Sequence, residues 1–218
     1  MVTNAEHARK AILRSTRRAR KVGRITPAAA FALGHRCFPI TYLIRNILTL
    51  QREDAWMHGS RRVQKNRLLR MLDERARIFL EVRKWLRERK GEEGWRDQIA
   101  SAHHGPYLPS GYCSHCGGCC EIASGFPDFP PDTAIPPRWQ RLFGDGLGRG
   151  HRFCAFLWEL DASGRSLCAI HPWRSNPCRV FEEEECDYFM KDLETNPLFD
   201  PKAFSVTCRR LSHLINRG

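Results

Sequence analysis

The sequence lacks any long apolar run. A membrane-spanning helix needs about 18 or more predominantly apolar residues, whereas the best candidate, residues 40–50, is short and contains Arg45. Residues 1–36 also lack the apolar segment of a secretory signal peptide, because Arg and Lys recur every few positions. We therefore expect no transmembrane segment and a cytoplasmic location.

Motifs that identify several common enzyme classes are missing as well. The chain contains no glycine-rich phosphate-binding loop, no nucleophile elbow and no metalloprotease helix motif. No methyl-donor site is recognisable either. These absences argue against the best-known hydrolases and nucleotide-dependent enzymes, and they leave open whether the protein is an enzyme at all.

Acidic residues are few in the first half of the chain. Residues 1–110 contain 24 Lys and Arg against 10 Asp and Glu, a net charge of +14. Residues 111–218 contain 12 against 14, a net charge of −2. This asymmetry predicts a basic helical region over residues 1–105 and a cysteine-rich region over residues 106–218.

The N-terminal segment predicts a basic helix. Thr3 and Glu6 have the spacing of a capping box, and Gly23 would end the helix. Its thin apolar face consists of Ala8, Ile12, Ala19 and Val22. Three interpretations remain open: a solvated helix, an organelle-targeting segment, or an arm that binds an acidic partner through residues 5–24. That partner would be a protein, a nucleic acid or a membrane surface.

Three more helices are predicted in the basic region. Thr26-Pro27 begins a short helix that ends at Gly34, and Pro39 begins the next one. A long helix follows from Ser60 and ends at Gly91. Its apolar stripe consists of Leu68, Leu72, Ala76, Phe79, Val82 and Leu86.

The opposite face of this long helix carries charges of both signs. Asp73 precedes Arg77 by four residues, which is typical of a surface ion pair, so the helix is predicted to be a scaffold. Residues 91–111 and 125–150 are rich in Gly and Pro and predict loops, with a short helix at 136–143 in the second.

Two apolar runs separated by Asp161-Ala-Ser-Gly164 predict a β-hairpin. A four-residue turn places Leu160 opposite Arg165. A slip of one residue would instead place Cys154 and Cys168 on the same face of the hairpin. The pattern leaves both registers open.

Cysteine is abundant, and its distribution is the strongest signal in the chain. Four of the ten cysteines lie within eight residues, at Cys113, Cys116, Cys119 and Cys120. Thiolates three positions apart can converge on one ion where the chain turns tightly, and Gly117-Gly118 permits the positive φ angle of such a turn. Disulfides are the alternative, but a reducing compartment favours metal or redox chemistry.

The remaining cysteines are more dispersed. Cys37 is predicted to be a lone buried thiol of the helical region, and Cys208 an exposed or packed thiol. Cys186 lies two helical turns beyond Cys178 and could approach the cluster. A helix is predicted to start at Arg179-Val-Phe and to carry the four glutamates at 182–185 near its N-terminus, where the helix dipole favours acidic residues.

The cysteine blocks resemble a known family. Their sequence is Cys113-x-x-Cys116-Gly-x-Cys119-Cys120, then Cys154-x-Phe156-Leu157, then Cys168-x-Ile170-x-x-x-Arg174-x-x-x-Cys178-Arg179-x-Phe181. This order is similar to that of the CxxCxxCC cysteine-cluster family (the YkgJ type), described as a zinc- or iron-chelating domain. The resemblance covers about residues 110–190. The sequence departs from the family pattern at His171 and Ser175, which affects the expected hairpin geometry more than the ligands.

The resemblance implies a bacterial-type cytoplasmic protein that binds metal through these cysteines. With Cys186 added from its position, the predicted ligands are Cys113, Cys116, Cys119, Cys120, Cys154, Cys168, Cys178 and Cys186. We slightly favour an iron–sulfur cluster over zinc, because the ligands are all sulfur and outnumber the four that one zinc ion needs.

Two functional classes follow. The first is a metal-binding or electron-transfer module that docks on a partner through its basic helical half. The second is a metal-dependent redox or group-transfer enzyme of the protein-methylation type, because a relative of the family's domain occurs in the flagellin lysine methylase. The predicted fold class is α+β and mainly helical: a basic helical half, then a small, loop-rich, metal-centred cysteine domain with one β-hairpin.

Overall fold

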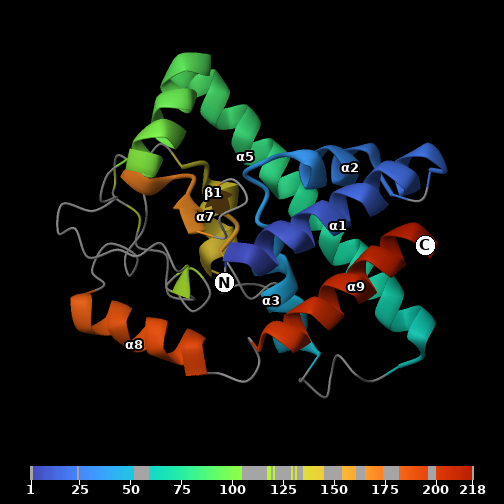
Figure 1. Cartoon of the computed structure of the whole chain (residues 1–218). Coiled ribbons are helices and arrows are strands. Elements are labelled where there is room, and N and C mark those ends of the chain that lie inside the picture. Colours follow the sequence, from blue (N-terminus) through green and yellow to red (C-terminus); the bar gives the residue numbers. More distant parts are fainter. Residues whose placement is uncertain are drawn as a thin grey trace.

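The chain forms a mainly helical α+β structure, as predicted (Figure 1). The structure, a computed structural model, describes residues 2–23, 25–51, 59–104, 117–118, 120, 129, 131, 135–144, 154–160, 165–173, 182–195 and 200–217. Within these ranges there are seven helices and one antiparallel hairpin. The elements are α1 (Val2–Lys21), α2 (Pro27–Gly34), α3 (Ile40–Leu50), α5 (Arg61–His104), α7 (Pro137–Gly144), β1 (Leu157–Leu160), β2 (Arg165–Cys168), a 3-10 turn (His171–Trp173), α8 (Glu183–Thr195) and α9 (Pro201–Arg217).

Helices α1 and α9, from opposite ends of the chain, lie side by side (Figure 1). Helix α1 also contacts α2 and α3, so it is a packed element and not a separate arm. It begins at Val2, which places Thr3 inside the helix instead of at its cap. The predicted face is partly wrong: Ile12 and Ala19 are buried, but Val22 is 59% exposed.

The other helices follow local sequence signals. Thr26 caps α2 by accepting a hydrogen bond from the Ala29 amide at 3.1 Å, and α3 begins directly after Pro39. All six predicted stripe residues of α5 are buried, and Asp73 pairs with Arg77 at 3.5 Å. These helices confirm the predicted scaffold.

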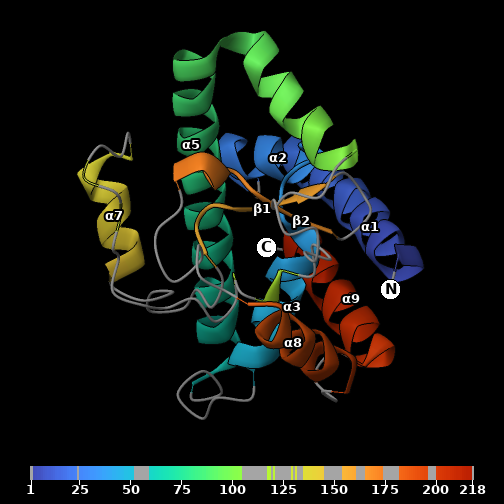
Figure 2. The ribbon, with the colours of Figure 1, turned by 90° about the vertical axis from the view of Figure 1, so that its left-hand side faces the viewer.

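The end of α5 differs from the prediction. Gly91 adopts φ 70° and ψ 173°, yet the chain continues in helical conformation to His104. The predicted loop is therefore wrong for residues 91–104. Glycine takes a positive φ without a Cβ clash, so Gly91 ends the first helical segment, as predicted, and a second segment continues beyond a sharp kink (Figure 2).

The hairpin has the register that a four-residue turn predicts. Leu160 pairs with Arg165, and Leu157 pairs with Cys168. All four residues of β1 are buried, because the strand lies against the helical region: the Glu159 amide donates a hydrogen bond to the Cys37 carbonyl at 3.0 Å. Strand β1 therefore packs directly against the helical region.

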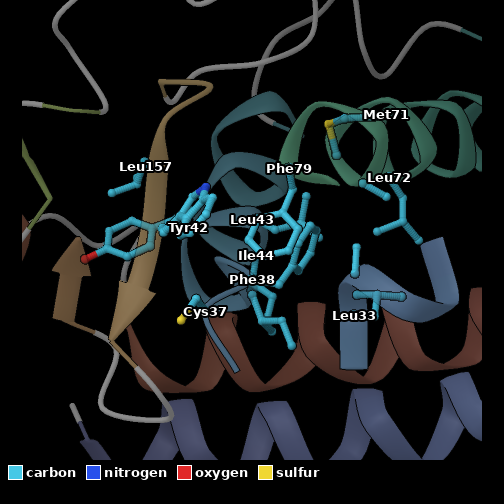
Figure 3. Close-up of a cluster of buried hydrophobic side chains, with 14 of the residues drawn as sticks. Leu33, Cys37, Phe38, Tyr42, Leu43, Ile44, Met71, Leu72, Phe79 and Leu157 are labelled. Atoms are coloured by element: carbon cyan, nitrogen blue, oxygen red, sulfur yellow. The ribbon is translucent and has the colours of Figure 1, made fainter. Parts of the chain in front are cut away.

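One hydrophobic core joins the two predicted regions. The rings of Phe79 and Trp158 lie 4.8 Å apart between centroids, and both residues belong to the same buried cluster. In Figure 3, Tyr42 of α3 points toward the hairpin, on the side of Leu157. The boundary at residues 105–106 remains a prediction, but the described parts of both regions contribute to this core.

Candidate metal centre

The end of the cysteine motif forms a tight turn. Gly117 has φ 78°, and the Cys120 amide donates a hydrogen bond to the Gly117 carbonyl at 3.0 Å. The predicted positive φ in the Gly117-Gly118 pair is therefore confirmed at Gly117. A Cβ atom at this position would lie 2.4 Å from the buried Tyr42 ring, so the turn packs directly on helix α3.

A backbone hydrogen bond joins this turn to the segment that precedes the hairpin. The Cys154 amide donates to the Cys120 carbonyl at 2.7 Å, and the Leu157 amide donates to the Cys154 carbonyl at 3.1 Å. The Sγ atom of Cys154 accepts a hydrogen bond from the Phe156 amide at 3.4 Å. An amide directed at sulfur stabilises a thiolate, which is the form that binds metal.

Cys168 is the last residue of β2 and lies beside the same segment. It pairs with Leu157, and the next residue, Ala169, donates its amide to the Phe156 carbonyl at 2.9 Å. Hydrogen bonds therefore connect the three stretches of backbone that carry Cys120, Cys154 and Cys168. Cys154 is buried, and the other two are partly buried.

Of the five remaining predicted ligands, the structure describes only Cys186. Cys113, Cys116, Cys119 and Cys178 lie outside the described residues. Cys186 lies in the first turn of α8, partly exposed and beside the predicted glutamates. Among the described residues, no three His, Cys, Asp or Glu side chains form a group that could hold a metal ion.

The two cysteines predicted to lie outside the site are both buried. Cys37 is fully buried beneath the hairpin, which confirms its prediction as a buried thiol. Cys208 is packed within α9, and burial raises the pKa of its thiol. A raised pKa keeps a thiol protonated and unreactive.

Arg75, which sequence reasoning missed, lies against Cys154. It is 4% exposed, and its Nη1 donates a hydrogen bond to the Cys154 carbonyl at 3.3 Å. Burial lowers the pKa of Arg75 to about 10, while the proximity of Cys154 opposes that shift. Its burial could have been predicted from its position, three residues after Leu72 and four before Phe79, on the buried side of α5.

A second buried cation joins α1 to the hairpin. Arg9 donates to the carbonyls of His35, Arg36 and Phe38 and forms an ion pair with Glu159, with Nη1 and Oε2 3.5 Å apart. The Thr41 amide and hydroxyl also donate to the Glu159 carboxylate. Burial raises the pKa of Glu159, and Arg9 and Thr41 oppose that rise.

Comparisons of the chain with protein-family models, curated proteins and solved structures found no match. They therefore add nothing to the family resemblance, which remains an interpretation of the cysteine spacing. No helix in the described part of the chain has the length and apolar character needed to cross a bilayer.

Proposed function

We propose that the protein is a cytoplasmic metal-binding module whose centre is held by the cysteines of the 113–120 cluster and of the hairpin region. The ligands would be drawn from Cys113, Cys116, Cys119, Cys120, Cys154, Cys168, Cys178 and Cys186. An iron–sulfur cluster is the favoured group and zinc the alternative.

The observation that carries the proposal is the 2.7 Å hydrogen bond between the Cys154 amide and the Cys120 carbonyl. It brings a segment of the CxxCxxCC motif to a second cysteine block that is more than thirty residues away in the sequence. Cysteines that only fill space in a core do not require two cysteine blocks to lie next to each other.

The chemistry around Cys154 fits a thiolate ligand. Its sulfur accepts a hydrogen bond from the Phe156 amide, and the buried guanidinium of Arg75 donates to the carbonyl of the same residue. Metal binding requires a deprotonated thiol, and both neighbours favour the anion. A bound iron–sulfur cluster would supply one-electron transfer. In this proposal, Arg75 and the Phe156 amide would stabilise negative charge on the sulfur and hold the Cys154 loop in place.

We further propose that the basic helical half docks the module on an acidic partner. The exposed face of α1, within residues 5–24, carries Lys10, Arg14, Arg17, Arg18, Arg20 and Lys21. Since α1 is packed in the fold, this docking surface would belong to the folded body.

Metal analysis and an absorption spectrum of protein purified without oxygen test the metal proposal. An iron–sulfur cluster gives stoichiometric iron, sulfide and visible absorption, whereas zinc gives a colourless protein. Replacing Cys116 or Cys154 by Ser should remove the metal, because a hydroxyl stays protonated and is a poor soft-metal ligand.

Cys37→Ser and Cys208→Ser are the matched controls, since both thiols are buried but lie outside the proposed ligand set. They should retain the metal. Metal-free wild-type protein from iron- and zinc-replete cells would contradict the proposal, as would Cys116→Ser and Cys154→Ser variants with full metal content.

A further inference from the structure

A basic groove runs between α1 and α9. It has a volume of about 740 Å³, and its lining includes three arginines and a histidine: Arg14, Arg18, Arg209 and His213. Ser15 and Asn216 also line it, and the Asn216 amide donates a hydrogen bond to the Ser15 hydroxyl at 3.0 Å, across the two helices. The groove therefore combines cations with neutral hydrogen-bonding groups.

No carboxylate in the described lining offsets this charge. Helix α9 contains no Asp or Glu, and α1 contains only Glu6. Glu6 is paired with Lys10, with Oε1 and Nζ 2.6 Å apart, and it lies two turns before the first groove arginine. A positive concave surface of this kind attracts and concentrates anions.

The basic side chains are arranged in two rows. Arg14 and Arg18 are four residues apart on α1, and Arg209 and His213 are four residues apart on α9. Residues with this spacing lie on one helix face, about 6 Å apart along the axis. Two parallel rows along a groove match a linear polymer with repeated negative charges better than a single small anion.

The lining distinguishes among polyanionic partners. Among the described lining residues, Val22 is the one large apolar side chain, whereas a helix pair that binds a bilayer presents a broad apolar face. Guanidinium groups bind phosphate oxygens in bidentate geometry. The same described residues include no aromatic ring that could stack on a base, so recognition would be limited to the phosphate backbone.

We infer that the α1–α9 groove binds the phosphate backbone of a single nucleic acid strand, without base recognition. The inference rests on the proposed docking role of the basic half, and it is independent of the metal. It also assigns half of the docking surface to α9, whereas the sequence indicated only the N-terminal helix as a basic surface.

Salt-dependent binding of a short, fluorescently labelled single-stranded oligonucleotide to the full chain tests this inference. If Arg14, Arg18 and Arg209 each neutralise one phosphate, log K should fall against log salt with a slope of about −2, from about 0.7 per phosphate. Arg14→Ala with Arg209→Ala should weaken binding and reduce the slope by about 1.4.

A control with the same charge loss is Arg87→Ala with Arg141→Ala, since both side chains are exposed on other helices. It should leave the slope unchanged. Arg14→Lys with Arg209→Lys keeps the charges and should keep the slope, which separates electrostatic loss from misfolding. Equal losses in the groove variant and in the control would overturn the groove assignment.

Anionic vesicles and polyglutamate, tested in parallel, separate this inference from the broader docking proposal. If either one binds in a groove-dependent way and the oligonucleotide does not, the docking role survives and the nucleic acid inference fails. If none of the three polyanions binds, both fail. Neither result alters the metal assay.

Discussion

Two buried arginines, Arg9 and Arg75, have their charge offset by different partners in two parts of the molecule. Arg9, at the junction of α1 with the hairpin, faces a carboxylate, Glu159, and three backbone carbonyls. Arg75, on α5, donates to the Cys154 carbonyl, and Cys154 and Glu74 are the neighbours that favour its charged form. Both residues are less than one-tenth exposed.

The difference is in the negative partner. A carboxylate ionises readily, so the Arg9 cluster has a complete ion pair that belongs to the fold. A thiol is neutral at its ordinary pKa unless a cation or a metal favours the thiolate. Arg75 thus lies where a charged sulfur would offset its burial, which is the situation that our metal proposal requires.

The largest expected effect is on the ion pair at Arg9. Arg9→Met leaves the Glu159 carboxylate buried without its cation and should lower the free energy of unfolding by about 3–5 kcal/mol at neutral pH. Urea denaturation measures this. Arg9→Met combined with Glu159→Leu should recover part of the loss, because no buried charge is left.

The Arg9→Met effect should also depend on pH. Burial already raises the pKa of Glu159 above 4.5, and loss of Arg9 raises it further. A carboxyl group with a raised pKa favours the folded state while it is protonated, at acid pH. This contribution is lost as the pH rises through the folded-state pKa. The penalty should therefore grow as pH increases above about 4.5. A pH-independent penalty would show that Glu159 is not the partner that matters.

Gly117→Ala should have the next largest effect, on the cysteine side of the comparison. It adds a Cβ atom at φ 78° and 2.4 Å from the Tyr42 ring. The two costs together are roughly 2–5 kcal/mol. Thermal unfolding measures the loss, and Tyr42→Leu in the same chain should relieve the steric part but not the backbone part. Gly34→Ala, where a Cβ meets nothing within 4 Å, is the matched control.

Arg75→Met tests whether the second arginine serves the proposed metal. Loss of a residue that supports a ligand typically lowers metal affinity about 10- to 100-fold. Competition with a chelator measures this change. Arg9→Met should leave the affinity of the folded protein unchanged, and equal effects of the two variants would remove the distinction between the arginines.

His35 should produce the smallest effect, at the Arg9 side. Burial, assisted by Arg83, Arg36 and Arg9, lowers the pKa of His35 to about 4, and its Nδ1 accepts the Cys37 amide at 3.2 Å. In the unfolded chain, His35 is protonated below its ordinary pKa of 6.5, whereas in the folded chain it stays neutral down to about pH 4. The free energy of unfolding should therefore decrease as the pH is lowered from 6.5 to 4.

After allowance for solvent screening, the His35 loss should be roughly 1–2 kcal/mol. His35→Phe keeps the ring contact with Phe79 and should flatten this part of the stability profile. An unchanged profile in the variant would assign the acid transition to other groups.

Local periodicity in the sequence determined most helices and the hairpin. The stripe of α5 recurs at helical spacing, and its burial requires only that some apolar surface cover it. The hairpin register, in which Leu160 pairs with Arg165, agrees with the four residues that separate them in the sequence. Gly91 was predicted to end a helix, but the second helical segment after it was missed, because the same positive φ serves a kink as well as a helix end.

The cysteine spacing and the family resemblance together predicted a metal site that includes Cys120, Cys154 and Cys168, but only the tertiary structure connected their backbones by hydrogen bonds. The pairing of α1 with α9, and with it the basic groove, was likewise undetermined, because no local pattern states which distant helix will cover a face. Arg9, Arg75 and Glu159 are polar and would be assigned to the surface from their residue type. Their burial depends on partners that are supplied from 26 to 150 positions away, and a charge is buried only where such a partner offsets its lost hydration.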